Sequence, residues 1–417
     1  MDLSKKYLKV CKIDDANFGK FAILCGADYL GVHVLEEKDI GSKKDLIDYL
    51  VALNGGVVIV TKITNFDLLN KIINLHHPYG IQIHCRPDPD LIKKLKDANP
   101  TIKIFSVVTG DLEVNLIERV SDLSEYLIYD SSYVGGTGKK NPLALIDKLK
   151  KEIKDKIFIA GGVNSSFLKK HKNLDVAGFD IQSYFRENDE LHYDRVEEIS
   201  RLIKGPKKGL LSVSVTDCGD VENITKEYAD NPHYNYHLDY SDGSLYGGFV
   251  TEKNEMVEKL SIMKNVPLDI HIFSRDEDQI NNLINEFKTI NSYSISSFFI
   301  QYFPQLNLNR FDQINNLTIS VYYKDFEDYF NKWTNFTDYL SVILPSEDIE
   351  KAPIVFDYMG KNKPFFLNKE IWFDRKLNED KILQLKKIVG IHFNVIVGKE
   401  ITRSQKTIKE IHEQFSL

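Results

Sequence analysis

The chain has 417 residues, of which 42% are hydrophobic, and a formal net charge of −7. This acidic balance, without a basic face or an aromatic-basic stripe, argues against nucleic acid as a partner. No apolar run approaches the roughly 20 residues of a membrane span, and the polar N-terminus does not have the pattern of a signal peptide. Four cysteines without a paired spacing indicate a reducing compartment, so we expect a cytoplasmic protein.

Short apolar runs alternate with amphipathic stretches along the whole chain. Residues 57–61 are strand-like, whereas residues 90–96 show the spacing of an amphipathic helix. Such alternation predicts parallel strands joined by helices, and the length allows two barrels of about 200 residues each. We therefore expect an α/β fold of two consecutive (β/α)8 TIM barrels, residues 1–205 and 206–417. The boundary falls in a stretch with a Pro and several Lys, residues 203–209.

In the first half, two strand-like runs end in groups suited to acid/base chemistry, the thiol of Cys11 and the carboxyl of Asp130. Barrels place the carboxyl ends of their strands around one mouth, where their chemistry takes place. A glycine-rich stretch, residues 135–138, follows, and glycines let backbone N–H groups approach an anion such as phosphate. Each feature also has a plainer interpretation, namely an inert buried thiol and a tight turn.

Five motifs in this half resemble those of phosphoribosylanthranilate isomerase, a family of single-domain barrels. They are residues 9–12 (Lys-Val-Cys-Lys), 82–85 (Gln-Ile-His-Cys), 129–131 (Tyr-Asp-Ser), 135–138 (Gly-Gly-Thr-Gly) and 160–164 (Ala-Gly-Gly-Val-Asn). The resemblance implies an Amadori-type aldose–ketose isomerisation with Cys11 as general base and Asp130 as general acid. It also implies substrate or phosphate contacts from Gln82, His84, Gly135, Gly136, Thr137, Gly138, Gly161, Gly162 and Asp180.

This half departs from the family pattern at three places. Lys12 stands where the family has Gly, and we expect this cation to lower the pKa of the Cys11 thiol. The family holds the anthranilate carboxylate with an Arg after its second strand, but residues 31–40 contain no Arg and two additional Glu. The Ser-Ser-Gly after the family's last-strand Asp is replaced by residues 182–184 (Gln-Ser-Tyr). The pattern therefore predicts the sugar phosphate but not the anthranilate side of the substrate.

In the second half, two imidazoles and two carboxylates stand at the ends of strand-like runs: His237, Asp239, His271 and Asp374. Two His and two Asp suit one divalent ion such as Zn, Mn or Fe. A single His-x-Asp pair is more often a surface hydrogen bond, but four such groups at the ends of barrel strands converge on one mouth. We therefore expect these four residues to bind one metal ion.

Residues 208–417 resemble ribulose-phosphate 3-epimerase, whose pattern has a first-strand Ser, His-x-Asp-x-Met-Asp-Gly, Leu-Asp-x-His and a late Val-Asp-Gly-Gly. The matching residues here are Ser212, His237, Asp239, Asp242, Gly243, His271 and Asp374. The resemblance implies metal-dependent epimerisation, with Asp239 and Asp374 as the acid/base pair and Ser212 as a substrate contact. Arg375-Lys376 replaces the family's Gly-Gly and Lys399 its closing Ser, so we expect side-chain cations, Arg375 and Lys399 among them, to bind the phosphate.

Together these patterns predict a bifunctional sugar-phosphate isomerase and epimerase that acts on a small phosphorylated sugar. The two chemistries fit in series, since the first makes a ketose and the second inverts the carbon next to the new carbonyl. Two alternatives stay open: one barrel is active and the other degenerate, or the whole chain is a sugar-binding scaffold without catalysis. We expect neither nucleic acid nor membrane as a partner, and a homodimer is an oligomeric state to be tested.

Overall fold

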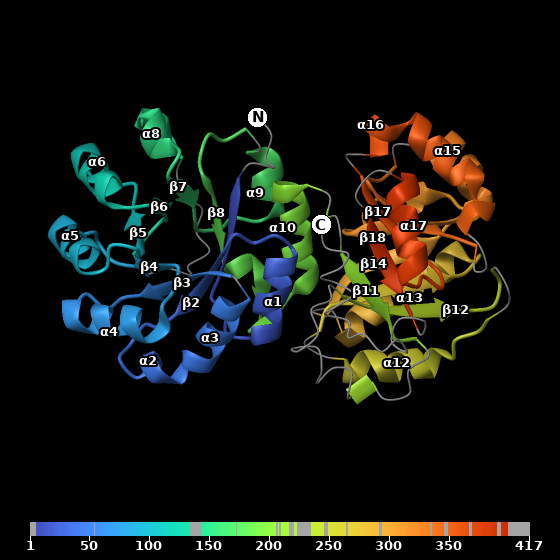
Figure 1. Cartoon of the computed structure of the whole chain (residues 1–417), viewed down its shortest axis with the longest axis horizontal. Coiled ribbons are helices and arrows are strands. Elements are labelled where there is room, and N and C mark those ends of the chain that lie inside the picture. Colours follow the sequence, from blue (N-terminus) through green and yellow to red (C-terminus); the bar gives the residue numbers. More distant parts are fainter. Residues whose placement is uncertain are drawn as a thin grey trace. The chain divides into compact units, whose positions relative to one another are not determined.

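The computed structural model describes residues 6–53, 55–133, 143–171, 173–205, 207, 210–216, 221–222, 235–245, 249–263, 266–291, 294–333, 336–345, 349–366, 369–389 and 393–398. The chain divides into two compact units, residues 1–190 with 199–204, and residues 191–198 with 205–417. Each unit contains a closed barrel of parallel strands with helices outside it (Figure 1). The predicted pair of consecutive (β/α)8 TIM barrels is therefore confirmed.

The first barrel consists of strands β1 to β8 in chain order. Its strands are β1 (Tyr7–Cys11), β2 (Tyr29–His33), β3 (Gly56–Thr61), β4 (Gly80–Ile83), β5 (Lys103–Val108), β6 (Tyr126–Tyr129), β7 (Ile157–Ile159) and β8 (Gly178–Ile181). The helices of this unit are α1 (Ala16–Leu24), α2 (Asp39–Ser42), α3 (Lys44–Ala52), α4 (Phe66–His76), α5 (Pro89–Ala98), α6 (Val114–Leu123), α7 (Ala144–Lys148), α8 (Lys151–Lys154) and α9 (Ser165–Lys170). Strand β1 pairs with both β2 and β8, which closes the ring.

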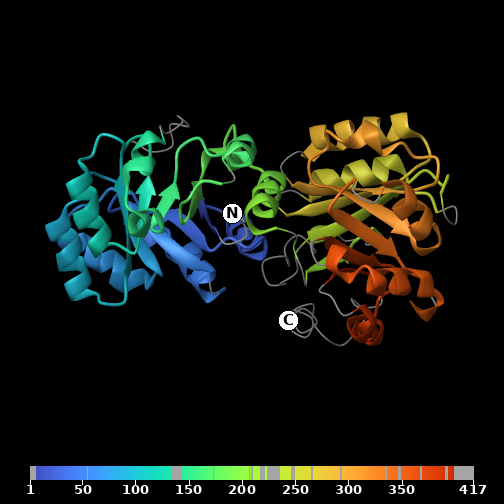
Figure 2. The same cartoon turned by 90° about the horizontal axis from the view of Figure 1, so that it is seen from above.

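The second barrel consists of strands β11 to β18, again in chain order, and Figure 2 shows its helices outside the strands. Its strands are β11 (Leu211–Ser214), β12 (Asn235–Ser241), β13 (Leu268–Phe273), β14 (Ile295–Gln301), β15 (Leu317–Tyr322), β16 (Tyr339–Ile343), β17 (Glu370–Asp374) and β18 (Asn394–Val397). Its described helices are α12 (Lys253–Ile262), α13 (Glu277–Asn291), α14 (Phe326–Trp333), α15 (Pro353–Lys361), α16 (Lys363–Phe366) and α17 (Glu379–Val389). No helix in the described parts of the chain is long and apolar enough to cross a membrane.

Asp and Asn side chains cap the first turns of several helices in the first barrel, and each of these helices follows a barrel strand. Asp15, Asn65 and Asn164 each accept a hydrogen bond from the backbone N–H three residues later, at 2.7, 3.0 and 2.8 Å. These N-caps satisfy N–H groups that have no partner within the helix. They anchor the loops that begin with Cys11, Thr61 and Ala160, so the side chains at these strand ends have a defined position.

The lower interior of the first barrel, toward the amino-terminal ends of its strands, is aromatic. Tyr29, Phe105, Tyr126 and Phe158 have ring centroids 5.1–6.3 Å apart, in edge-to-face or tilted arrangements. Such ring pairs add stability beyond their buried area. These rings fill the interior of the first barrel below the carboxyl ends of its strands.

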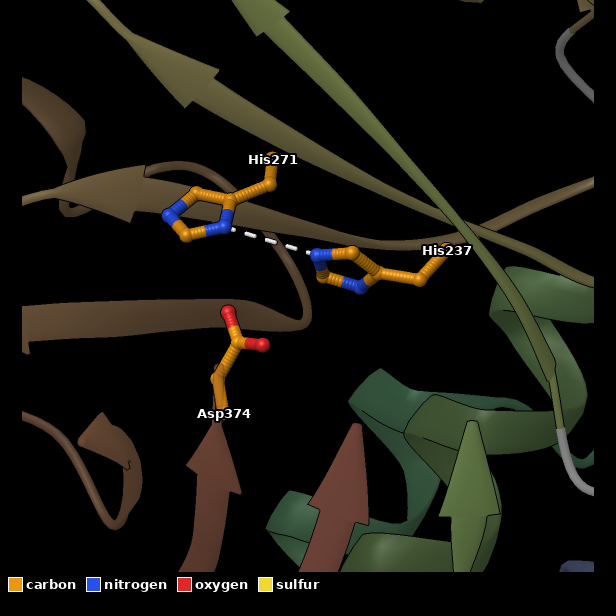
Figure 3. Close-up of side chains that lie close together, drawn as sticks. All are labelled: His237, His271 and Asp374. Atoms are coloured by element: carbon orange, nitrogen blue, oxygen red, sulfur yellow. Dashed lines mark hydrogen bonds between the residues drawn. The ribbon is translucent and has the colours of Figure 1, made fainter. Parts of the chain in front are cut away.

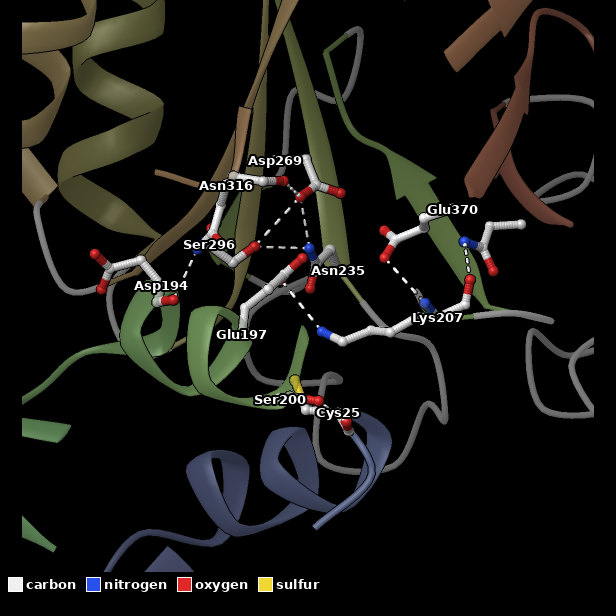
Figure 4. A network of polar contacts seen from close by, with 12 residues as sticks. Cys25, Asp194, Glu197, Ser200, Lys207, Asn235, Asp269, Ser296, Asn316 and Glu370 are labelled. Carbon is white, nitrogen blue, oxygen red and sulfur yellow. Dashed lines mark hydrogen bonds and ion pairs between the residues drawn. The ribbon is translucent and has the colours of Figure 1, made fainter. Parts of the chain in front are cut away.

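The corresponding layer of the second barrel is polar and surrounds the buried carboxylate of Asp269 (Figure 4). This carboxylate accepts hydrogen bonds from Ser212 Oγ at 3.1 Å, Asn235 Nδ2 at 2.6 Å and Ser296 Oγ at 3.2 Å, and a further one from Ser297. Burial raises the pKa of Asp269 to about 6. Several donors are needed here because a buried carboxylate without partners is costly.

Helix α10 (Tyr193–Lys204) is divided between the two units. Within the second unit, the carbonyl of Asp194 accepts a hydrogen bond from Asn316 Nδ2 at 2.7 Å (Figure 4). Within the first unit, Lys204 Nζ donates to the carbonyl of Lys6 at 2.9 Å. The division thus passes through a helix, whereas the sequence places the boundary directly after it.

Candidate functional site

A pocket at the carboxyl ends of the strands in the first barrel brings together the described residues that were expected to act there. Cys11 ends β1 and Asp130 directly follows β6. The predicted residues that line the pocket are Cys11, Gln82, His84, Asp130, Gly161, Gly162 and Asp180. The predicted phosphate loop, Gly135, Gly136, Thr137 and Gly138, lies outside the described residues.

The thiol of Cys11 lies beside a buried ion pair. Lys9 Nζ is 3.3 Å from Cys11 Sγ and 2.8 Å from Asp180 Oδ2, and all three side chains are buried. Lys9 and Asp180 are direct register partners on β1 and β8. Burial raises the pKa of Cys11 to about 11; the charge of Asp180 adds to this rise, and Lys9 opposes it. The thiol is therefore protonated at neutral pH.

Lys12 lowers the pKa of Cys11 through a backbone hydrogen bond, whereas the cation that lowers it is Lys9 and not the expected ammonium of Lys12. The ammonium of Lys12 lies 3.9 Å from the carboxylate of Asp189, and its backbone has φ 62°, outside strand β1. Side chains alternate along a strand, so Lys9, two residues before Cys11, shares its face. The cation that contacts the thiol is Lys9.

The backbone of Lys12 leads to a prediction about stability. A φ of 62° is the left-handed region, which costs an L-residue about 1–2 kcal/mol, whereas Gly adopts it readily. We expect Lys12→Gly to raise the free energy of unfolding by roughly 0.5–1 kcal/mol, after allowing for the greater flexibility of Gly in the unfolded chain. Urea denaturation followed by circular dichroism measures this, with Lys12→Ala as the control that keeps the unfavourable φ. A Gly variant no more stable than the Ala variant would contradict it.

Among the pocket residues that the sequence did not predict, His33 and Lys62 carry ionisable side chains. His33 ends β2, and its Nε2 lies 3.5 Å from Cys11 Sγ. Lys62 follows the last residue of β3. Cys11 was predicted because it ends an apolar strand-like run, and His33 and Lys62 also lie at the ends of such runs. The same criterion would therefore have identified them from the sequence.

Gln82 and His84 form one wall of the pocket. Gln82 Nε2 lies 3.2 Å from His84 Nδ1, and both side chains are buried. Burial lowers the pKa of His84, and the charge of Asp130 opposes this decrease. Nearby, Gly161 and Gly162 also line the pocket, with φ of 77° and 67°, a backbone conformation that glycine adopts readily.

The four expected metal residues of the second barrel also come together. Figure 3 shows the carboxylate of Asp374 pointing toward the imidazoles of His237 and His271, and ligand atoms of these three residues all lie within 4.8 Å of one another. Asp239 Oδ1 lies 3.3 Å from His237 Nε2 and 3.4 Å from His271 Nδ1. His237, His271 and Asp374 come from β12, β13 and β17, so separate strands build the cluster.

The distances in this cluster fit a metal ion. His237 Nε2, His271 Nδ1 and Asp239 Oδ1 are 3.3–3.4 Å from one another. Three ligand atoms about 2.0–2.1 Å from one tetrahedral ion are separated by about 3.3–3.4 Å. Asp239 is further oriented by Thr216, whose Oγ1 donates to its other carboxylate oxygen at 2.8 Å. The residues present therefore suit one divalent ion.

The two carboxylates of the cluster differ in their electrostatic surroundings. Burial alone raises the pKa of Asp239, but His237 and His271 lower it well below its usual range. Burial raises the pKa of Asp374, and the nearby charge of Asp239 adds to this rise. In the protein alone, Asp239 therefore tends to be ionised, whereas Asp374 holds a proton more readily than an ordinary Asp.

Of the remaining predicted residues of the second barrel, Ser212 lies below this cluster, Arg375 adjoins it and Lys399 is not described. The backbone N–H of Arg375 donates a hydrogen bond to Asp374 Oδ1 at 2.5 Å. Ser212 belongs to the polar layer below, where its hydroxyl donates to Asp269 Oδ2 and the carbonyl of Asn235, both at 3.1 Å. Arg375 follows β17 with φ 89°, and its guanidinium lies 5.6 Å from the ring centroid of Tyr322. Lys399 lies outside the described residues.

Comparisons with known proteins concern the first barrel. Residues 8–185 match the sequence profile of the family described as N-(5'phosphoribosyl)anthranilate (PRA) isomerase. N-(5'-phosphoribosyl)anthranilate isomerase of Bacillus cereus (strain Q1) is 30% identical over 166 residues, which are 38% of this chain and 78% of that protein. The enzyme of the same name from Staphylococcus carnosus (strain TM300) is 25% identical over 216 residues, 48% of this chain and 99% of its own.

Solved structures of the same kind of protein are similar to part of the chain. The crystal structure of phosphoribosyl anthranilate isomerase from Thermotoga maritima is 17% identical, with a TM-score of 0.40, and the match covers 48% of this chain and 99% of that one.

Proposed function

The chain belongs, through its first barrel, to the N-(5'-phosphoribosyl)anthranilate isomerase family, and on this premise we propose that this barrel isomerises a phosphorylated N-substituted sugar amine to a ketose. The observation that carries the proposal is that Cys11 and Asp130, at the ends of two different strands, line one pocket. An Amadori-type rearrangement needs a base for a C–H proton and an acid for the ring oxygen. A thiolate and a carboxylic acid supply these two groups.

In the proposed reaction, Asp130 gives a proton to the ring oxygen, and the ring opens to an iminium ion. Cys11, as the thiolate, takes the proton from C2, and the electron pair of that C–H bond forms the C1–C2 double bond of an enolamine. Protonation at C1 and loss of the C2 hydroxyl proton then give the ketose. Lys9, 3.3 Å from Sγ, stabilises the thiolate by donating a charge-assisted hydrogen bond.

The rest of the pocket suits a phosphorylated substrate. Gly161 and Gly162 line the pocket and have no side chains, so a phosphate oxygen can approach their backbone N–H groups closely. The N-substituent is less restricted, because residues 31–40 contain no Arg and Leu35 lines the pocket instead. We therefore propose a phosphorylated pentosylamine as the substrate class, with anthranilate as one of several N-substituents to test.

Incubation in D₂O tests this proposal. The purified chain is mixed with phosphoribosylanthranilate and with phosphoribosylamines that carry other N-substituents, and NMR follows the products. We expect a ketose with one deuterium at C1, because solvent supplies the proton at that carbon. Absence of both turnover and deuterium incorporation across the panel would reject the proposal and favour a binding scaffold.

For the second barrel we propose metal-dependent epimerisation at the carbon next to a ketose carbonyl. The tetrahedral spacing of His237, Asp239 and His271 supports this, with Asp374 as the fourth residue. When bound, a divalent ion supplies positive charge that stabilises an oxyanion on the substrate. Asp239 lies on β12 and Asp374 on β17, the second and seventh strands of the ring. Their carboxylates therefore reach the substrate from different sides, so that one can remove the proton from the carbon and the other can return a proton on the opposite face.

A pentulose phosphate in D₂O distinguishes this proposal from that of a degenerate barrel. We expect deuterium at C3 of both the substrate and its epimer when the protein carries Zn, Mn or Fe. The matched comparison is the same protein after chelation, which should lose exchange at C3 but keep the isomerase reaction of the first barrel. If no metal-loaded sample exchanges C3, the second barrel is not an epimerase of such sugars.

A further inference from the structure

The pocket of the first barrel contains an imidazole that the isomerase chemistry described above does not use. His33 ends β2, and its Nε2 lies 3.5 Å from Cys11 Sγ, within hydrogen-bonding reach of a thiol. Both side chains line the same pocket. The only other polar side chain recorded in a hydrogen bond with Sγ, among the described residues, is Lys9 at 3.3 Å.

The strand register gives the thiol a direct path to this imidazole. Cys11 pairs with Gly31 on the neighbouring strand, and His33 is two residues further along on the same face. A Cβ at Gly31 would lie 2.6 Å from Cys11 Sγ and 3.1 Å from Lys9 Nζ. The absence of a side chain at Gly31 therefore makes the space in which the thiol lies against His33.

We propose that His33 accepts the thiol proton of Cys11, so that the two form a thiol–imidazole pair and His33 acts as a positioning residue for the base. The inference rests on the proposed role of Cys11 as the base. The S–H bond of Cys11 breaks as an N–H bond forms at Nε2 of His33. The thiolate then takes the substrate proton, and the imidazolium releases its own proton to water.

The surroundings of the Cys11 thiol explain why it needs a proton acceptor. With its pKa raised to about 11, about one Cys11 thiol in 10⁴ is ionised at pH 7 without help. The fixed cation Lys9 is largely neutralised by Asp180 at 2.8 Å, so it does not ionise the thiol by itself. A nearby neutral base can take the proton without adding a permanent charge to the pocket.

His33 is such a base. Burial lowers the pKa of His33 to about 4, with Lys9, His84 and Lys12 adding to this and Asp14 opposing it, so the resting ring is neutral. A neutral imidazole has one nitrogen that can accept a hydrogen bond. With pKa values of about 11 for the thiol and about 4 for the imidazole, the transfer is uphill for the isolated groups. The pair therefore forms through the mutual attraction of thiolate and imidazolium across 3.5 Å in a buried pocket. A neutral resting pair also avoids leaving two buried charges when the pocket is empty.

Alkylation of Cys11 by iodoacetamide tests the pair without any sugar, since only the thiolate reacts. The rate is measured from pH 6 to pH 10 on the peptide that contains Cys11, by mass spectrometry, in the full chain. The variants are His33→Gln, whose amide can bond to the thiol but cannot take its proton, and His33→Ala with and without added imidazole. His77→Asn, an exposed histidine of the same barrel, is the matched control.

We expect alkylation at pH 7 to be at least about tenfold slower in His33→Gln and His33→Ala than in the parent chain and His77→Asn. The difference should shrink toward pH 10, and imidazole should restore the rate in the Ala variant. Identical pH profiles in the parent chain and in His33→Gln would overturn the inference. Thermal unfolding curves identify a variant that has simply lost its fold, in which case the other variant decides.

The two proposals fail separately. If alkylation depends on His33 but no phosphorylated sugar amine is turned over, the pair is supported and the isomerase assignment is rejected. If the isomerase reaction needs Cys11 and its pH profile is unchanged in His33→Gln, the assignment is supported and the pair is rejected.

Discussion

Replacing Cys11 with Ala should reduce kcat/KM of the isomerase reaction by about 10²–10⁴-fold, the usual cost of losing a positioned acid or base. The thiol is the only side chain among the described residues of β1 that combines a place in the pocket with a titratable proton and no ion-pair partner. Lys9 does not replace it, because its ammonium is paired with Asp180. The loss should appear in kcat, since Cys11 acts on the reacting C–H bond and not on the phosphate.

Asp130→Asn should have an effect of the same order, about 10²–10⁴-fold, because an amide cannot donate a proton to the ring oxygen. The carboxyl of Asp130 is buried and accepts a hydrogen bond from Ser131 Oγ at 3.2 Å, so Asn fits the same space. The test is steady-state kinetics with a phosphorylated sugar amine that the parent chain turns over. Cys85→Ser, a cysteine of the same barrel outside this pocket, is the control and should keep full activity. Near-normal turnover in both Cys11→Ala and Asp130→Asn would end the assignment.

Replacing His271 with Ala should abolish metal binding by the second barrel. His271 Nδ1 is one of three atoms with tetrahedral spacing, and the buried cavity left by Ala offers no donor in its place. We expect about one divalent ion per chain in the parent protein and close to none in His271→Ala, as measured by elemental mass spectrometry after reconstitution with Zn, Mn or Fe. The epimerase exchange should disappear together with the metal.

Asp374→Asn should separate metal binding from proton transfer. Its ligand oxygen lies within 4.8 Å of the two imidazoles, whereas Asp239 lies directly beside both, so His237, Asp239 and His271 should keep part of the metal. Exchange at the substrate carbon should nevertheless fall by about 10²–10⁴-fold, because the amide cannot move a proton. Asp242→Asn changes a carboxylate directly after the end of β12, outside the cluster, and as the control it should retain its metal. A metal-free parent protein with full epimerase activity would refute the site.

The sequence predicted correctly which residues lie at the carboxyl ends of the barrel strands, because short local patterns identify those strand ends. Alternating strand and helix patterns imply barrels, and a barrel brings the carboxyl ends of all its strands to one mouth. For this reason Cys11, His84 and Asp130, distant along the chain, were expected together and line one pocket. The same reasoning brought His271 and Asp374 together, although more than a hundred residues separate them.

The sequence alone misled where the partner of a residue depends on which way its side chain points. Lys12 is adjacent to Cys11 in the chain, yet the cation in contact with the thiol is Lys9. The alternation of side chains along a strand would have indicated Lys9, since residues two apart share a face. Ser212, placed with the substrate by its motif, instead lies one layer below His237 and donates to Asp269, because Ser214 and not Ser212 is the register partner of His237.

The sequence by itself determined the two barrels and the residue types at the strand ends, because hydrophobic periodicity and local motifs depend on near neighbours in the chain. Only the tertiary structure decided how those residues are paired and charged. Lys9 meets Asp180 through the closure of β1 on β8, and Cys11 meets His33 across the space at Gly31. Such pairs depend on strand register and burial, and burial sets the pKa of each group. The chemistry of the first barrel therefore follows from contacts between strands that are separate in the sequence.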